Sequence, residues 1–397
     1  MKYDFIIGGA GCAGLTLAFL LNQSELKHKK ILLIDVKKKV RNDRTFCFWE
    51  NEENLFENIV FKKWKKLEIK KQNHILPFQL KDYTYKMIRG IDLYDYVKTN
   101  ITANPNIQLI NEKIIDFESA PDGVKVKTQE NEYFSDYYFN SLTELTLKVK
   151  NSNYHSLTQH FLGWYIESED EPFNPELATF MDYSVPQNND LRFCYVLPYS
   201  KTGALVEYTL FSKEILKAQE YKEELARYIK NNLKIYNYKI IHKEYGKILM
   251  TNYPFQSKIN KNIINIGIPA GKVKPSCGFA FKRIKTHCEY IVKSMEKGKM
   301  PVIKNSLWHK RFRLYDSTFL NVLTNKNVEK KEVFFRLFKY NHIHKVFRLL
   351  DEKTNVFEEI RIFITVHVSI FLKAIFSELF RIFGRKALKS VFANLVR

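Results

Sequence analysis

The sequence predicts an α/β fold in which a Rossmann-type domain is interleaved with a β-sheet domain and followed by a helical carboxyl-terminal region. Three observations lead to this prediction. The chain opens with a strand, a glycine-rich turn and a helix. Its middle alternates polar and apolar residues as strands do. From Met300 onward the pattern is mainly helical and aromatic. With 397 residues, 45% of them hydrophobic, the chain can bury a large core in two connected units.

The opening segment has the pattern of a dinucleotide-binding turn. Residues 4–7 form a short apolar strand and residues 15–22 continue with helix formers; between them stands Gly9-Ala10-Gly11-Cys12-Ala13-Gly14. Gly9 permits a tight turn, Gly11 lets the backbone approach a pyrophosphate, and Gly14 lets the helix pack closely on the strand. The start of the helix offers free N–H groups and a partial positive charge. We therefore predict that Gly9, Ala10, Gly11 and Gly14 bind a dinucleotide.

Asp35 ends the next strand, at residues 30–34, and completes the motif. It lies 21 residues after Gly14, close to the spacing of about 20 expected for the acid that accepts hydrogen bonds from a ribose 2′-hydroxyl. The same carboxylate would repel a 2′-phosphate. An ordinary glycine-rich turn is the alternative, but it explains neither the two strands nor the acid. Because the motif begins so near residue 1, we expect bound FAD rather than exchangeable NAD.

Composition narrows the class of protein. The formal charge of +21 invites nucleic-acid binding, yet the lysines are scattered among Asn, Ile, Tyr and Phe, so we expect no nucleic-acid partner and favour an anionic lipid surface. The cysteines are odd in number and widely spaced without a CxxC pair, which predicts reduced thiols, no metal site and a cytosolic compartment. We expect no secretory signal. The sequence contains no uninterrupted run of about 20 apolar residues, so we expect no membrane-spanning helix.

Two arginines in the first third of the chain are candidates for cofactor contact. Arg44 belongs to Asn42-Asp43-Arg44-Thr45-Phe46-Cys47-Phe48-Trp49, directly after the ribose-binding strand, where loops reach toward a cofactor's reactive end. The alternative is a packed loop with a surface salt bridge. Residues 61–85 alternate like a pair of strands. Arg89 then shares a helix face with Leu93 and Val97 and is expected to point at the flavin or pyrophosphate.

Glu207 is the candidate acid. It lies within Ala204-Leu205-Val206-Glu207-Tyr208-Thr209, which follows Phe193-Cys194-Tyr195-Val196-Leu197-Pro198 through a turn at residues 200–203. A carboxyl buried among such residues has a raised pKa and can donate a proton near neutral pH. The pattern alone leaves open whether Glu207 faces the core or lies on the solvent face of an edge strand.

Further along, residues 263–267 predict another buried strand, and the loop from Ile268 to Phe281 that follows contains Gly271 and Lys272, a plausible second phosphate or flavin contact. Residues 360–372 alternate at period two, which favours a strand, whereas the helical pattern next to them favours a helix, so the sequence leaves both open there. Residues 372–389 form an amphipathic helix with a wide apolar face. Such a helix suits a membrane interface, with packing on the protein's own core as the alternative.

These patterns divide the chain into interleaved units. Residues 1–60, 88–150 and 259–298 are assigned to the FAD-binding domain, residues 61–87 and 151–258 to the sheet domain that holds substrate, and residues 299–397 to the helical, membrane-associated region.

The sequence resembles the bacterial lycopene beta-cyclases over nearly its whole length. The resemblance is carried by the glycine motif, residues 42–49, and four further segments, namely Gln159-His160-Phe161-Leu162-Gly163-Trp164, Met181-Asp182-Tyr183, Leu205-Val206-Glu207 and Lys274-Pro275-Ser276-Cys277-Gly278-Phe279, together with Arg311-Phe312-Arg313-Leu314-Tyr315-Asp316. Conservative departures occur at Phe46, Tyr183, Cys277 and Phe279. The resemblance implies a Rossmann-type FAD-binding domain of the glutathione-reductase-like or hydroxylase-like kind.

By this resemblance the protein would close β-ionone rings on lycopene, without net redox change, using reduced FAD with NAD(P)H as the electron source. Glu207 would be the essential acid, and Asp182 a second catalytic candidate for structural support or proton relay. The apolar substrate implies a monotopic protein on the cytoplasmic side of the membrane, in contact with other carotenoid-pathway enzymes. The alternatives are an FAD-dependent oxidoreductase, such as a prenyl reductase or hydroxylase, and a membrane-surface binding protein without catalysis.

Overall fold

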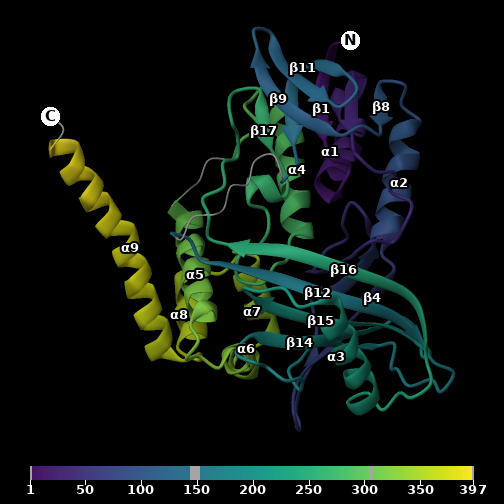
Figure 1. Ribbon diagram of the computed structural model, residues 1–397, viewed down its shortest axis with the longest axis vertical. Coiled ribbons are helices and arrows are strands. Elements are labelled where there is room, and N and C mark those ends of the chain that lie inside the picture. Colours follow the sequence, from purple (N-terminus) through teal and green to yellow (C-terminus); the bar gives the residue numbers. More distant parts are fainter. Residues whose placement is uncertain (1, 144–152, 304–306, 396–397) are drawn as a thin grey trace.

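The amino-terminal strand lies inside a mixed sheet in the computed structural model, which describes residues 2–143, 153–303 and 307–395 (Figure 1). β1 (Lys2–Gly8) pairs in parallel with β2 (Ile31–Ile34) and β11 (Glu132–Asn140), β8 (Ile107–Ile110) extends the sheet beyond β2, and β17 (Ile263–Asn265) pairs with the end of β11. β9 (Ile114–Ala120) and β10 (Gly123–Thr128) add an antiparallel ribbon. The strands predicted at residues 4–7, 30–34 and 263–267 are confirmed.

Helices α1 (Cys12–Asn22), α2 (Gly90–Thr102) and α4 (Phe281–Glu296) pack on this first sheet and share one hydrophobic core with it. The parallel strands and their helices form the Rossmann-type α/β fold that the sequence predicts. Short 3-10 helices occur at Glu25–His28, Glu57–Ile59 and Ile268–Ala270.

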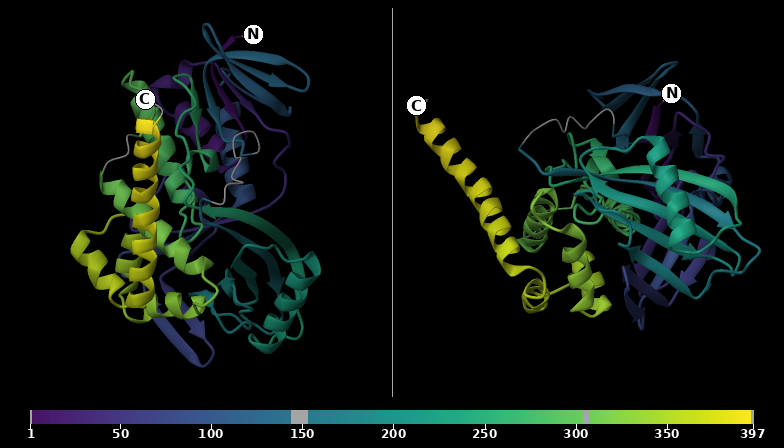
Figure 2. Two further views of the ribbon diagram at one scale, coloured as in Figure 1. Left: turned by 60° about the vertical axis from the view of Figure 1, so that its left-hand side comes forward. Right: turned by 60° about the horizontal axis from the view of Figure 1, so that its bottom comes forward.

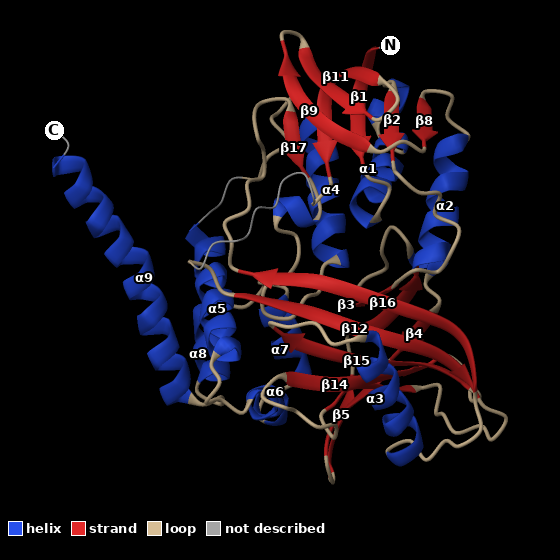
Figure 3. Cartoon of the chain, in the orientation of Figure 1, coloured by secondary structure: helices blue, strands red, loops and turns tan. Residues whose placement is uncertain are grey.

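The second sheet crosses the lower half of the molecule (Figure 3). Its order is β16 (Lys239–Thr251), β12 (Ser156–Glu167), β15 (Gly203–Ser212), β14 (Leu191–Pro198), β13 (Leu177–Asp182), β5 (Lys66–Lys71) and β6 (His74–Gln79). All neighbours are antiparallel except β13 and β5. One face packs on α3 (Ala218–Asn231), and the other faces the first domain and the carboxyl-terminal helices.

A small sheet joins the two domains. It consists of β3 (Thr45–Glu50), β7 (Thr84–Arg89) and β4 (Lys62–Trp64), with β7 in the middle. Residues 45–49 are therefore strand, because they pair with β7, and only residues 42–44 of the octet belong to a loop.

The carboxyl-terminal region is helical, as predicted, and comprises α5 (Leu307–Thr324), α6 (Lys330–Lys339), α7 (Ile343–Leu350), α8 (Val356–Phe363) and α9 (Val368–Leu395). At residues 360–372, where the sequence left strand and helix open, the structure has the end of α8 and the start of α9, and not the strand that the period-two pattern favoured. Asn355 and Glu358 form a capping box that starts a helix there: the Asn355 side chain accepts from Glu358 N–H at 3.0 Å and the Glu358 carboxylate from Asn355 N–H at 2.9 Å. Among the described residues, we find no helix with the length and apolar character to cross a membrane.

Candidate active site

A cavity of about 490 Å³ lies where the two domains meet. The start of α1, β3 and the loop before α4 line it from one side, and β12, β14, β15 and β16 from the other. Residues predicted from distant parts of the sequence meet here: Gly11, Arg44 and Glu207 all line it. Phe46, Phe161, Tyr195 and Phe279 supply aromatic walls.

The glycine motif closes one end of this cavity. Gly9 has a φ of +96°, and a Cβ on Gly14 would lie 1.8 Å from the Gly9 carbonyl oxygen, so both positions require glycine. Around Gly11, by contrast, no atom lies within 4 Å of where a Cβ would be. Gly9 and Gly14 are therefore required by the backbone itself, whereas the space beside Gly11 is open to a ligand.

The Asp35 side chain is fixed beside the same turn. Its carboxylate accepts hydrogen bonds from the N–H groups of Ala10 at 2.6 Å and Lys37 at 2.9 Å. It is nearly buried at the end of β2, the position predicted for the ribose-binding acid.

Glu207 faces a second carboxyl group that the sequence analysis missed. Glu207 on β15 and Glu244 on β16 are both opposite Gly163 of the intervening strand β12. A Cβ on Gly163 would lie 3.0 Å from the Glu244 Cγ, so the glycine makes room for Glu244 to lean across β12. The two buried carboxyl groups therefore interact across β12, and each shifts the pKa of the other.

Burial and the neighbouring Glu244 raise the pKa of Glu207 well above its ordinary value. Burial also raises the pKa of Glu244, to about 7. Two like charges are costly in so buried a place, which favours a pair that retains a proton near neutral pH. β15 lies between β12 and β14, which excludes the edge-strand interpretation of Glu207.

Threonine hydroxyl groups donate hydrogen bonds to both carboxyl groups of the pair. Thr209 donates to Glu207 at 2.7 Å, and Thr45 donates to Glu244 at 2.6 Å. The Tyr165 hydroxyl lies 2.6 Å from the Thr45 hydroxyl, so a chain of hydrogen bonds runs from Tyr165 through Thr45 to Glu244. No local pattern in the sequence marks Glu244 or Tyr165.

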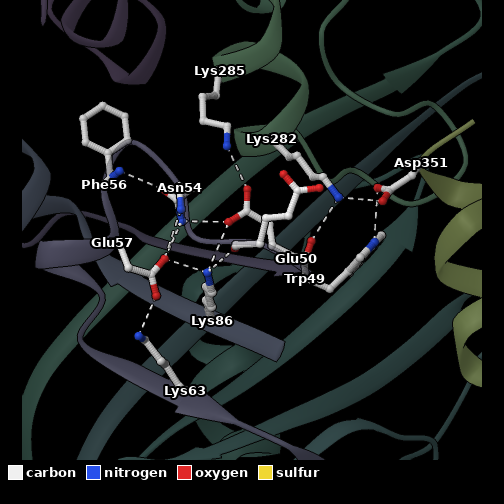
Figure 4. A network of polar contacts seen from close by, with 11 residues as sticks. Trp49, Glu50, Asn54, Phe56, Glu57, Lys63, Lys86, Lys282, Lys285 and Asp351 are labelled. Atoms are coloured by element: carbon white, nitrogen blue, oxygen red, sulfur yellow. Dashed lines mark hydrogen bonds and ion pairs between the residues drawn. The ribbon is translucent and has the colours of Figure 1, made fainter. Parts of the chain in front are cut away.

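A polar network holds β3, which carries Thr45, against α4 and the residue after α7 (Figure 4). The buried Lys86 bridges Glu50 at 3.4 Å and Glu57 at 2.6 Å, and Lys285 of α4 reaches Glu50 at 2.9 Å. Asp351 binds Lys282 at 2.6 Å and the Trp49 indole N–H at 3.2 Å. These contacts fix the position of the strand whose threonine bonds Glu244.

The remaining candidates lie elsewhere. Arg89 does not line the cavity: its guanidinium pairs with Asp92 at 2.7 Å and stacks on Phe61. Gly271 has a φ of +67° and lines a different surface pocket. The flavin contact expected of these two therefore has no support in the geometry. Asp182 is buried on the opposite face of the sheet, where it accepts hydrogen bonds from Tyr228 of α3 at 2.8 Å and from Ser184 N–H at 2.9 Å.

Comparison with known proteins adds a family. A family model described as "Lycopene cyclase protein" matches residues 4–377. No curated protein matches. Solved structures share the fold at low identity. A geranylgeranyl bacteriochlorophyll reductase-like protein from Thermoplasma acidophilum has a TM-score of 0.58 at 15% identity, covering 94% of this chain and 96% of that one. The flavin-dependent brominase Bmp2 has a TM-score of 0.62 at 11% identity, covering 89% of this chain and 94% of that one. A flavoprotein/dehydrogenase from Cytophaga hutchinsonii has a TM-score of 0.61 at 12% identity, covering 95% of this chain and 100% of that one.

Proposed function

Since the chain belongs to the lycopene cyclase family, we propose that it is a lycopene beta-cyclase that converts lycopene through gamma-carotene to beta-carotene. The observation that carries the proposal is the buried Glu207–Glu244 pair, with the pKa of Glu207 raised, in a cavity with aromatic walls. Ring closure by acid catalysis needs a carboxylic acid that keeps its proton at neutral pH, and also walls that exclude water from a carbocation.

In the proposed reaction Glu207 donates its proton to C2 of a terminal isoprene unit, which leaves a cation at C1. The C5=C6 double bond attacks C1 and closes the ring, and loss of the C6 proton to the carboxyl pair forms the β-ring. One proton enters and one leaves, so the substrate's formula is conserved and no oxidant is consumed. While the proton is away, the pair carries two negative charges close to the cation, and these stabilise it.

The residues around Gly11 fit FAD. Gly11 offers the open space that a pyrophosphate needs, Asp35 lies where the ribose would bind, and Arg44 and the start of α4 line the cavity where the flavin ring would lie. Reduced FAD, when bound, supplies negative charge near the cation without transferring hydride, with NAD(P)H as the proposed electron source.

Gly11→Val tests the cofactor site. The backbone at Gly11 has φ −85° and ψ −169°, which valine adopts readily, so the variant is expected to fold and to lose flavin. Absorbance of the purified protein reports flavin content, and Gly11→Ala provides a smaller step in the same direction. A Gly11→Val protein with full flavin content would contradict this site.

Expression in a lycopene-accumulating host, followed by pigment analysis, tests the reaction itself. We expect beta-carotene from the wild-type chain and unconverted lycopene from Glu207→Gln. The proposal would be refuted if neither the wild-type chain nor Glu207→Gln produced a cyclic pigment.

An oxidoreductase is the second candidate, because one structure of similar fold is described as geranylgeranyl reductase-like. The two candidates differ in electron balance. A cyclase needs reduced flavin but no net reductant, so anaerobic turnover with limiting reductant should form many rings per flavin reduced. One reductant consumed per product molecule would favour the oxidoreductase.

We also propose that the protein is monotopic on the cytoplasmic side of the membrane and binds through α9. Its described part exposes Phe376 and Phe380. Replacing both by serine should reduce cosedimentation with phospholipid vesicles, and unchanged cosedimentation would transfer membrane contact to another surface.

A further inference from the structure

A second cavity, of about 250 Å³, lies between the second sheet and the carboxyl-terminal helices. Its walls come from β13 and from α5, α6, α8 and α9, and they are overwhelmingly apolar. Phe180, Phe334 and Phe338 form its inner wall, and all three are buried. Nothing in the carboxyl pair's chemistry requires this space, so it needs an explanation of its own.

The inner end of this cavity adjoins the candidate active site. Cys277 and Phe279 line both cavities. The Phe279 ring is stacked on Phe180 with centroids 6.2 Å apart and meets Trp49 edge-on at 4.6 Å. Cys277 and Phe279 therefore belong to a wall that the two spaces share.

The charged groups in the wall are neutralised. Lys274 lies 3.0 Å from Asp316 and 2.9 Å from Glu352, and its side chain is buried with theirs. Because these charges are paired, the cavity presents no free charge at this wall to an apolar ligand.

The outer end of the cavity opens on the surface between α8 and the start of α9. Ile360, Ile364, Val368 and Leu372 line the cavity and are also 42 to 62% exposed. Phe357 and Phe376 extend the exposed apolar surface on either side. Figures 1 and 2 show α9 starting next to α8 and then leading away from the rest of the molecule. A contiguous apolar patch of this kind marks an interaction site.

The charges around this opening suit an anionic lipid surface. Arg361 and Lys373 are exposed beside it. Every carboxylate between Val356 and Arg381 is ion-paired: Glu358 with Arg348, Glu359 with Arg311, and Glu378 with Arg381. A basic rim around an apolar opening is expected to bind anionic headgroups and leave the opening against the hydrocarbon.

We propose that this cavity is a binding channel for a linear polyene, which enters from the membrane hydrocarbon between α8 and α9 and passes Phe279 to reach Glu207. The proposal rests on the proposed function, because a long substrate with one end at Glu207 must place the rest of its length in a second apolar space. The membrane is thus the source of the ligand as well as the docking surface.

Ile364→Glu tests the channel, with Ile241→Glu as its matched control. Both isoleucines are exposed, at 62% and 56%, so neither substitution should unfold the protein, but Ile241 lies on β16, away from α8 and α9. The probe is the methyl ester of parinaric acid, a linear conjugated tetraene whose fluorescence rises when it leaves water. Titration of the full-length, flavin-bound protein with this ester gives an affinity that does not depend on turnover.

We expect Ile364→Glu to weaken probe binding at least about tenfold, because a carboxylate at the opening must lose water as the ligand enters. Ile241→Glu should bind as the wild type does. Cyclisation of lycopene supplied in phosphatidylcholine–phosphatidylglycerol vesicles should fall in parallel. Unchanged probe affinity in Ile364→Glu, equal loss in both variants, or no binding by the wild type would overturn the channel. Failure of the wild type to cyclise lycopene would instead refute the proposed function, and the binding result would stand by itself.

Discussion

The two faces of the second sheet bury an acid each, and they use it differently. On β15, Leu205 and Glu207 line the cavity, whereas Val206 and Tyr208 pack with α3. Asp182 of β13 lies on the α3 side. Glu207 and Asp182 are about equally inaccessible to solvent. Burial alone therefore does not distinguish a candidate catalytic acid from a structural one.

The neighbours of each carboxyl group distinguish the structural acid, Asp182, from the candidate catalytic acid, Glu207. Asp182 accepts hydrogen bonds from two donors, the Tyr228 hydroxyl and the Ser184 N–H, and so binds α3 to the sheet. Glu207 lines a cavity and has Glu244 as its neighbour, whose charge helps to raise the pKa of Glu207. An acid surrounded by donors holds structure together, whereas an acid opposite another acid holds a proton.

The largest effect is expected at Glu207. Glu207→Gln keeps the shape and the hydrogen bond from Thr209 but removes the transferable proton, so cyclisation should fall about 10²- to 10⁴-fold. Flavin content should stay at the wild-type level. Product formation by the purified variant, compared with that of Glu167→Gln on the exposed end of β12, measures this. Wild-type turnover in Glu207→Gln would remove the acid from the mechanism.

Glu244 should reveal itself in the pH dependence of stability. Its pKa is raised to about 7 in the folded protein, so between pH 4.5 and pH 7 the unfolded chain loses this proton first and stability falls as pH rises. The loss is about 3 kcal/mol. Glu244→Gln should remove this part of the slope. Urea unfolding of the flavin-free protein at pH 5 and pH 8 is the measurement, and equal slopes in the two proteins would contradict the shared proton.

Asp182 should affect stability and not chemistry. Asp182→Ala leaves the buried Tyr228 hydroxyl without its acceptor, at a cost of about 1–3 kcal/mol. Turnover per flavin-bound molecule should remain near wild type. Tyr228→Phe is the matched control, and in the double variant the two losses should not add. A specific loss of turnover in Asp182→Ala would revive a proton-relay role.

The smallest effect is expected at Gly163, between the two acids. An alanine methyl would lie 2.9 Å from the Leu205 Cδ1 and 3.0 Å from the Glu244 Cγ, so the side chains must shift by a few tenths of an ångström. We expect less than about a tenfold loss of turnover. The pH dependence of stability should also flatten, because the carboxyl groups move apart. An unchanged slope would show that the close approach across β12 does not matter.

The sequence alone determined the parts whose cause is local. The strand, glycine turn and helix from Lys2 to Asn22, and the acid at Asp35, follow from residues close in sequence, and the structure has all of them. The helix at residues 356–363 had such a signal too, in the Asn355–Glu358 capping box, but the period-two pattern that follows concealed it. Glu207 stood out because an acid interrupts an apolar strand.

Only the tertiary structure decided which face Glu207 occupies and which residue it meets. β15 became a central strand by pairing with β12 and β14, and Glu244 reached Glu207 because both register opposite Gly163. Strand register between distant segments is set by the packing of whole sheets, which no short pattern encodes. Arg89 was expected on a helix face, but it is the last residue of β7, and its guanidinium pairs with Asp92 in the first turn of α2.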